Sequence, residues 1–152
     1  MAIRNLTPFN DPQFRKKSRP VTAFDEKLWV LLEDMFDTLK KAKGYGCAAV
    51  HVGILRRVVV IHDENNVIEL INPEITHESD EKQTVMESSI APNAPHGSYV
   101  FRPKEVTVSA FDRNGKTITL NAKGFLAATL CHEIDHLDGI LYTDKIINGG
   151  KP

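Results

Sequence analysis

Two histidines separated by three residues carry the clearest chemical signal in this sequence. Residues 132–136 read His-Glu-Ile-Asp-His, which matches the pattern H-E-x-x-H. On a helix, His132 and His136 lie one turn apart on the same face, so both imidazole rings can bind one divalent metal ion. Glu133 lies beside them, where its carboxylate can take a proton from a water molecule. The motif predicts metal-assisted hydrolysis, and the alternative is a helix that carries two surface histidines and no metal.

The third ligand of such a metal must come from outside this motif. Metzincin proteases extend the pattern to H-E-x-x-H-x-x-G-x-x-H, and here Gly139 matches but Tyr142 stands where the last histidine would be. Other zinc proteases take a glutamate from a later helix, whereas Asp144 is the only acidic residue after Asp138. We therefore expect the third ligand to lie upstream of residue 132, and a general zinc endopeptidase is disfavoured.

Two segments have the apolar spacing of helices. Residues 123–137 form the helix that would present the histidine pair, and Asp138-Gly139 supplies its stop signal. A second helix is predicted over residues 22–43, because this segment has an acidic start, a basic end and a glycine after it. The apolar stripe of the late helix consists of Leu126, Leu130, Ile134 and Leu137, and that of the early helix of Leu28, Leu31, Leu32, Met35, Phe36 and Leu39.

Four β-rich segments predict two hairpins. Residues 57–62 and 67–72 are joined by four polar residues, and residues 105–112 pair with residues 116–120 through Asn114-Gly115. With one early helix, several antiparallel strands and one buried late helix, the sequence predicts an α+β fold. We expect this fold to be a single domain spanning residues 1–152.

The remaining segments are expected to be largely irregular. No regular element is expected before Val21, and Pro73 is expected to close the strand over residues 67–72. Residues 77–83 are expected to form a loop or an edge strand, and residues 91–98 to be irregular.

Composition and charge exclude several classes of partner. The 152 residues include 19 Lys+Arg and 20 Asp+Glu, for a net charge of -1, and 41% are hydrophobic. This is the balance of a soluble globular domain, without the basic cluster that nucleic acid requires. No run of about 18 apolar residues occurs, so we expect no membrane span. The two cysteines, Cys47 and Cys131, lie far apart in the sequence, which favours a reducing compartment, so we expect the protein in the cytoplasm. We also expect it to be a monomer.

Three short segments stand out when the whole chain is considered. Residues 44–51 read Gly-Tyr-Gly-Cys-Ala-Ala-Val-His, residues 87–91 read Glu-Ser-Ser-Ile-Ala, and residues 132–136 follow. In order and composition they resemble the motifs G-x-G-x-A-A-x-Q, E-G-C-L-S and H-E-x-D-H of the peptide deformylases. These metal-dependent hydrolases remove the formyl group from the N-terminal methionine of new bacterial proteins. The resemblance covers nearly the full chain and implies antiparallel sheets packed around a central C-terminal helix that carries H-E-x-x-H.

The resemblance implies the roles of the third motif. His132 and His136 would bind one divalent metal ion, which is Fe²⁺ in the family, with Zn²⁺ or Ni²⁺ as alternatives. Glu133 would act as general base and then as general acid. The partner would be a formylated peptide or the N-terminus of a nascent chain.

The first two motifs would bind the substrate and polarise its carbonyl group. Gly44 and Gly46 belong to the segment that the resemblance assigns to substrate binding, and the glycines themselves suit a tight turn after the first helix. In the family a glutamine side chain and a backbone N–H face the developing oxyanion. The matching positions are His51 and Ile90, so the backbone donor is retained and the side-chain donor is altered.

The second motif departs from the family at the metal. Ser89 stands where the family has its cysteine ligand, and a neutral hydroxyl binds such metals far more weakly than a thiolate. We expect weakened metal affinity and impaired deformylation, with a catalytically inactive, peptide-binding protein as the alternative. A further hypothesis is that His51 replaces the missing ligand, because three histidines suit catalytic zinc. Cys131 is a poor candidate, since it points about 100° away from His132 on a helix.

Three other residues receive weaker assignments. Glu87 and Arg102 match a charged pair of the family, and we expect both to be structural. His96 lies in a segment that borders the peptide groove in deformylases, so a substrate contact is one hypothesis for it.

Overall fold

The computed structural model describes residues 2–147 and has an α+β architecture. A five-stranded antiparallel sheet has the order β1-β2-β3-β6-β7, and β4 and β5 form a separate two-stranded antiparallel ribbon. The helices are α1 (Glu26–Ala42) and α2 (Gly124–Leu137). The strands are β1 (Gly46–Ala48), β2 (Val58–Asp63), β3 (Asn66–Glu78), β4 (Lys82–Glu87), β5 (Ser98–Pro103), β6 (Glu105–Phe111) and β7 (Thr117–Lys123). Three short 3₁₀ helices span Pro12–Arg15, Ala49–Val52 and Tyr142–Lys145.

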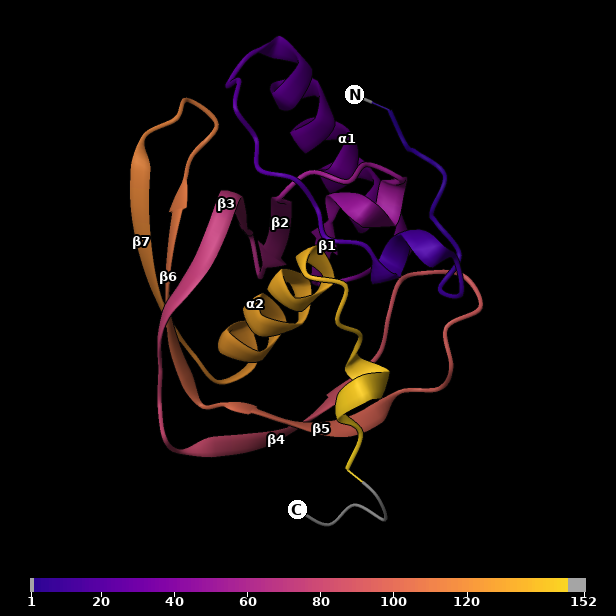
Figure 1. Ribbon diagram of the computed structural model, residues 1–152, viewed down its shortest axis with the longest axis vertical. Coiled ribbons are helices and arrows are strands. Elements are labelled where there is room, and N and C mark those ends of the chain that lie inside the picture. Colours follow the sequence, from indigo (N-terminus) through magenta and orange to yellow (C-terminus); the bar gives the residue numbers. More distant parts are fainter. Residues whose placement is uncertain (1, 148–152) are drawn as a thin grey trace.

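The late helix α2 lies at the centre of the molecule. Figure 1 shows it enclosed between the large sheet and the β4–β5 ribbon. The two faces of the large sheet form two cores, because alternate residues of a strand point to opposite faces. On β2, Val59 and Ile61 pack in the core around α2, whereas Val58 and Val60 pack in the core against α1. The expected antiparallel sheets around a central C-terminal helix are therefore confirmed.

Both helices lie where the apolar spacing predicts them. At the start of α1, the Asp25 side chain accepts a hydrogen bond from the backbone N–H of Leu28. The left-handed residue that ends α1 is Lys43, with φ of 56°, and not the neighbouring glycine. The helix α2 begins at Gly124, whose φ is +59°. No helix among residues 2–147 is long and apolar enough to cross a membrane.

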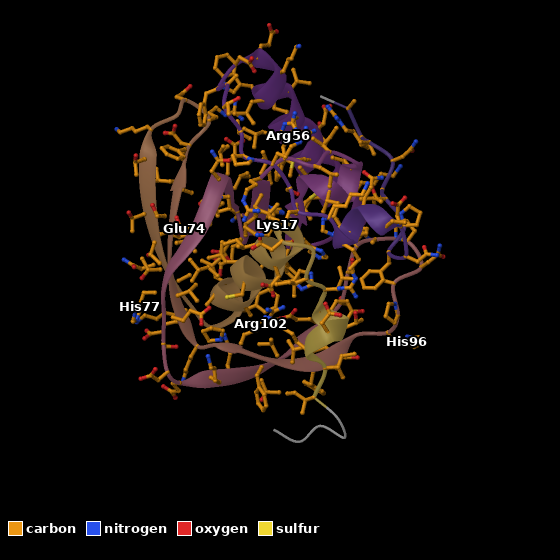
Figure 2. All side chains as sticks on the ribbon, viewed as in Figure 1. Lys17, Arg56, Glu74, His77, His96 and Arg102 are labelled. Atoms are coloured by element: carbon orange, nitrogen blue, oxygen red, sulfur yellow. The ribbon has the colours of Figure 1, made fainter. Side chains whose placement is uncertain are left out.

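Both predicted hairpins are confirmed. The strand pairs β2–β3 and β6–β7 form at the expected positions. However, β3 continues through Pro73 to Glu78, although Pro73 was expected to close it. The pairing with β6 shifts between Ile71 and Glu74, so the proline falls at an irregularity where its missing N–H breaks no regular ladder. His77 lies exposed on this extension, as Figure 2 shows.

One other expectation about irregular segments is wrong. A 3₁₀ helix over Pro12–Arg15 precedes Val21, because the Asp11 side chain accepts from the Gln13 N–H and Pro12 suits the first position. The loop or edge strand expected over residues 77–83 is found as the connection from β3 to β4 and the start of β4, which pairs with β5 in a two-stranded ribbon. The segment between these two strands is irregular, as expected.

The glycine after α2 generates the first prediction. Gly139 has a φ of +75°, and a Cβ there would lie 2.7 Å from the backbone oxygen of Arg15. Gly124 has a φ of +59° but no atom within 4 Å of such a Cβ. Gly124→Ala should therefore lower the free energy of unfolding by about 1 kcal/mol through the backbone conformation alone. Gly139→Ala should lower it by at least about 2 kcal/mol, because a clash is added.

Urea unfolding followed by circular dichroism measures both variants. Equal losses of stability would show that the contact between Gly139 and Arg15 is not a constraint on this fold.

Candidate functional site

The three motifs meet at one cleft of about 270 Å³. The first motif contributes the chain from the end of α1 through β1, the second follows β4, and the third lies on α2. The cleft therefore opens between the large sheet, the ribbon and the central helix. Its lining residues are Ala42, Lys43, Gly44, Tyr45, Gly46, His51, Val85, Met86, Glu87, Ser88, Ser89, Ile90, Phe125, Ala128, Thr129, His132 and Glu133.

The two glycines of the first motif are required by close approach. A Cβ on Gly46 would lie 2.7 Å from Oε2 of Glu133, and a Cβ on Gly44 would lie 2.5 Å from Cγ2 of Ile90. The chain does turn between α1 and β1, but neither glycine has a positive φ, so the observed need for glycine is the close approach. Any side chain at Gly46 would instead push the Glu133 carboxylate out of its place.

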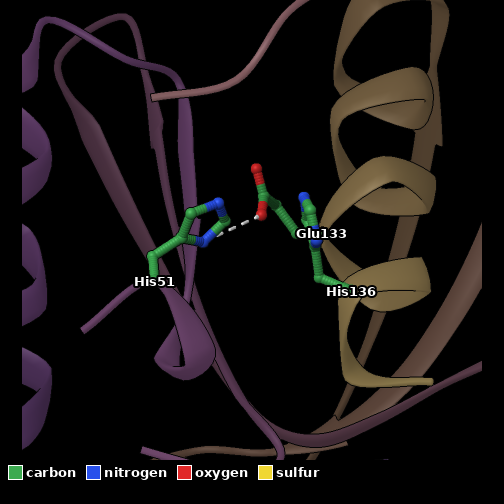
Figure 3. A group of neighbouring side chains, drawn as sticks. All are labelled: His51, Glu133 and His136. Carbon is green, nitrogen blue, oxygen red and sulfur yellow. Dashed lines mark ion pairs between the residues drawn. The ribbon is translucent and has the colours of Figure 1, made fainter. Parts of the chain in front are cut away.

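Glu133 lies between two histidine rings, as Figure 3 shows. Potential ligand atoms of His51, Glu133 and His136 all lie within 4.8 Å of one another. His51 Nδ1 is 3.9 Å from Glu133 Oε1, and the His51 and His136 ring centroids are 4.7 Å apart. Burial raises the pKa of Glu133 to about 7, although the neighbouring His132 opposes this rise. Burial lowers the pKa of His51 to about 3 and that of His136 well below its ordinary value.

His132 and His136 face each other across a short gap. Their Nε2 atoms lie 3.3 Å apart. Two nitrogen ligands on a tetrahedral zinc, each about 2.0–2.1 Å from the ion, are themselves separated by about 3.3 Å. The spacing of the pair therefore fits a shared metal ion.

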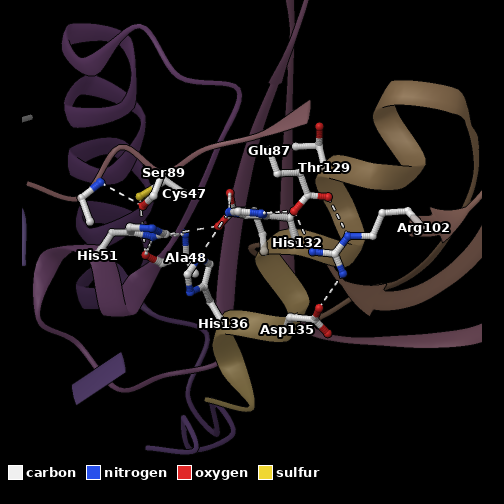
Figure 4. Close-up of polar contacts among 12 residues, drawn as sticks. Cys47, Ala48, His51, Glu87, Ser89, Arg102, Thr129, His132, Asp135 and His136 are labelled. Carbon is white, nitrogen blue, oxygen red and sulfur yellow. Dashed lines mark hydrogen bonds and ion pairs between the residues drawn. The ribbon is translucent and has the colours of Figure 1, made fainter. Parts of the chain in front are cut away.

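A chain of buried charges fixes the orientation of His132 (Figure 4). Glu87 accepts two hydrogen bonds from Arg102, at 2.6 and 2.7 Å, and Arg102 also donates to Asp135 at 2.6 Å. Burial would raise the pKa of Glu87, but the bonds from Arg102 and His132 outweigh it and hold the pKa at about 2. The ionised carboxylate thus accepts from His132 Nδ1 at 2.6 Å. With its Nδ1 proton donated to Glu87, His132 turns Nε2 toward His136.

Two buried polar atoms beside this pair lack partners. Glu133 Oε1 and His136 Nδ1 have no hydrogen-bond partner in the part of the chain that the structure describes. Buried polar atoms are normally satisfied, and an exception often marks an ion or water site. Together with the spacing of the Nε2 atoms of His132 and His136, the unpartnered Glu133 Oε1 indicates that the residues present fit a divalent metal ion.

The second motif supplies a backbone donor and a turn. Ser89 Oγ accepts a hydrogen bond from the Ala91 N–H at 3.0 Å, so the hydroxyl closes its own turn. Among residues 2–147, the backbone N–H of Ile90 has no hydrogen-bond acceptor. That N–H lies in a segment lining the cleft and is available to a ligand.

The structure brings most of the residues selected from the sequence to this cleft. Gly44, Gly46, His51, Ser89, Ile90, His132 and Glu133 line it, and His136 lies directly behind. Cys131 is buried outside this lining, and His96 is exposed and does not reach it (Figure 2).

Sequence reasoning missed four residues that shape the site. Asp135 holds the far side of Arg102, and Phe14 packs on both His51 and His136 at ring distances of 5.3 and 5.4 Å. Tyr45 and Phe125 stack edge to face at the mouth of the cleft, 4.8 Å apart. Phe125 lies seven residues before His132 on one helix face, a spacing visible in the sequence, whereas nothing local marks Phe14.

The comparisons with known proteins all match peptide or polypeptide deformylases. The family model of polypeptide deformylase matches residues 3–151. The peptide deformylase of Finegoldia magna is 46% identical over 150 residues, which cover 97% of this chain and 92% of that protein. Peptide deformylase 2 of Clostridium acetobutylicum is 46% identical over 147 residues, covering 96% of this chain and 97% of that one. The crystal structure of peptide deformylase from Thermotoga maritima superposes with a TM-score of 0.93 at 32% identity, covering 97% of this chain and 99% of that one.

The buried arginine generates the second prediction. Arg102→Met should lower the free energy of unfolding by about 3–5 kcal/mol, because Glu87 would remain as a buried carboxylate without its guanidinium partner, whereas Asp135 keeps Lys145 at 3.2 Å. The affinity for zinc should fall as well, since Glu87 would no longer fix His132. Urea unfolding and a zinc titration measure the two effects.

Lys104→Met is the matched control. Lys104 pairs with Glu81 at 3.2 Å on the surface, where such pairs contribute little. If both variants unfolded at the same urea concentration and bound zinc alike, the proposed support of the site by Arg102 would be refuted.

Proposed function

Because the chain belongs to the polypeptide deformylase family, we propose that it hydrolyses the N-formyl group of formyl-methionyl peptides. The single observation that carries this proposal is the buried pair His132 and His136, with Glu133 beside it at the base of the cleft. In this proposal the protein acts as a cytoplasmic monomer on the N-termini of nascent chains.

His132 and His136 would hold the divalent ion. Fe²⁺ is the metal that the family implies, and Zn²⁺ or Ni²⁺ would suit the same nitrogen ligands. The ion would act as a Lewis acid, which polarises oxygen atoms in the site. Glu87 supports the ligand pair by accepting the Nδ1 proton of His132.

Glu133 would move the proton that hydrolysis requires. Its carboxylate takes a proton from the attacking water as the oxygen bonds to the formyl carbon. The same carboxyl group then delivers the proton to the amine nitrogen as the carbon–nitrogen bond breaks. The products are formate and a free N-terminal amine. The buried position of Glu133, 4% exposed, favours direct transfer by excluding bulk water.

The cleft would position the formylated end of the peptide. The free N–H of Ile90 would donate to the carbonyl oxygen as negative charge develops on it. Apolar side chains beside this donor suit the methionine side chain of the substrate. They belong to Val85, Met86, Phe125 and Ala128.

Ser89 is the reason to propose weakened metal binding and impaired turnover. Its hydroxyl is neutral and accepts the Ala91 N–H, so it offers the ion much less than a thiolate would. This same observation favours a second candidate function, in which the protein binds peptides in the cleft without hydrolysing them. Calorimetric binding of a formyl-methionyl peptide without formate release would identify that case.

Metal-dependent formate release tests the proposal. Anaerobically purified protein supplied with Fe²⁺, Ni²⁺ or Zn²⁺ should release formate from a formyl-methionyl peptide. Glu133→Gln should lower this rate at least about a hundredfold, because an amide cannot carry the proton. Glu74→Gln is the matched control, since Glu74 lies exposed on β3 away from the cleft (Figure 2). A metal-loaded protein that releases no formate would refute deformylation.

Restoring the thiolate is a separate prediction. Ser89→Cys should bind zinc at least about tenfold more tightly than the wild type, because a thiolate is a stronger ligand than a hydroxyl. Competition with a chromophoric chelator measures the dissociation constants. Unchanged affinity would mean that position 89 does not face the metal.

A further inference from the structure

We infer that His51 is the third protein ligand of the metal ion, in the place that Ser89 leaves unfilled. The site would then hold its ion by three imidazoles, from His51, His132 and His136, which we call the histidine cluster. This inference rests on the proposed function only in assuming that the cleft binds a divalent ion. The chemistry is suitable, because three neutral histidines form a common ligand set of catalytic zinc.

The rings of the histidine cluster are neighbours in the structure. The His51 and His136 ring centroids are 4.7 Å apart, and those of His132 and His136 are 4.9 Å apart. Phe14, itself fully buried, packs against the rings of both His51 and His136. The 3₁₀ helix Ala49–Val52 therefore places the His51 imidazole in the same buried region as the imidazoles of His132 and His136 on α2.

Two gaps separate His51 from the other members of the histidine cluster. Potential ligand atoms of His51, Glu133 and His136 lie within 4.8 Å of one another, and His132 is outside this group. Ligands of a tetrahedral zinc are about 3.3 Å apart, so His51 must move closer to His136 by no more than about 1.5 Å, and must also approach His132.

A hydrogen-bond acceptor beside His51 suits its use as a ligand. The Nδ1 atom of His51 lies 3.2 Å from the backbone oxygen of Ala48, which can accept the Nδ1 proton and leave Nε2 free. Metal-binding histidines are typically oriented in this way by a carbonyl or carboxylate group. Glu87 provides the equivalent acceptor for His132.

Other side chains near the cleft fit the third position less well. The Ser89 hydroxyl accepts the Ala91 N–H. Neither Cys47 nor Cys131 is among the residues that line the cleft, and the Cys47 thiol donates to the backbone oxygen of Ala48 at 3.5 Å. Glu133 could itself reach the ion, but the proposed hydrolysis requires its carboxylate for proton transfer.

His51 has one competing role, which the experiment must separate. Its Nδ1 also lies 3.1 Å from the backbone N of Ala48, and accepting that N–H would place the ring proton on Nε2. His51 would then be a hydrogen-bond donor toward the substrate, as the resemblance implied. Glutamine can donate such a bond but binds zinc or cobalt poorly, so His51→Gln distinguishes the two roles.

The test measures metal binding rather than turnover. Wild type, His51→Gln and Ser89→Ala are each titrated with Zn²⁺ in competition with a chelator, and each is loaded with Co²⁺ for absorption spectroscopy. If His51 is a ligand, His51→Gln should raise the zinc dissociation constant at least about tenfold and change the cobalt spectrum. Ser89→Ala should leave both unchanged, and circular dichroism should show that all three proteins are folded.

Two results would overturn the inference. If His51→Gln binds zinc as tightly as the wild type with the same cobalt spectrum, His51 is not a ligand, while the proposed hydrolysis still stands. If the wild type binds neither metal, both this inference and the proposed function fail.

Discussion

The buried guanidinium of Arg102, 2% exposed, is the interaction on which the arrangement of the site depends. It joins β5 to Glu87 at the end of β4 and to Asp135 on α2. A buried ion pair contributes little net stability, because desolvation offsets the attraction between the charges. Its effect here is on position: the fixed Glu87 carboxylate orients His132, and the Nε2 atom of His132 therefore faces His136. The ribbon is thus tied to the helix at the point where a metal ion would bind.

Close approach is the second constraint, and it explains why distant segments contain small residues. The β1 backbone at Gly46 lies so near α2 that any side chain at position 46 would collide with the side chain of Glu133. The absence of a side chain at Gly44 makes room for Ile90 in the same way. The size of the residues in one motif therefore limits where the side chains of the other motifs can lie. The glycines of the first motif leave space for the Glu133 carboxylate of the third motif and for the segment of the second motif that presents the Ile90 N–H. A rigid, water-poor site results, in which burial raises the pKa of Glu133 to about 7.

Local patterns in the sequence predict the elements whose periodicity is strong. Both helices and both hairpins belong to this group, as does the spacing of the H-E-x-x-H motif. The strand β1 has only three residues, all buried, and shows no alternation that a pattern could reveal. The ribbon strand β4 is mostly polar, so its pairing with β5 depends on tertiary contacts. The position of His51 beside α2 follows only from a family resemblance, and the packing of Phe14 on two histidines has no local signal at all.

Compared with the motifs that the family resemblance supplies, the sequence departs at Ser89 and His51, which both line the cleft, and matches at Glu133, His132 and His136. The proposed hydrolysis and the proposed role of His51 both require that an ion binds within the histidine cluster. X-ray diffraction at the zinc absorption edge, from crystals grown with Zn²⁺, tests this most directly. We predict one anomalous peak bounded by the Nε2 atoms of His132 and His136, with the His51 ring directed at it. A fully ordered cluster with no peak, or a peak elsewhere in the molecule, would contradict the account.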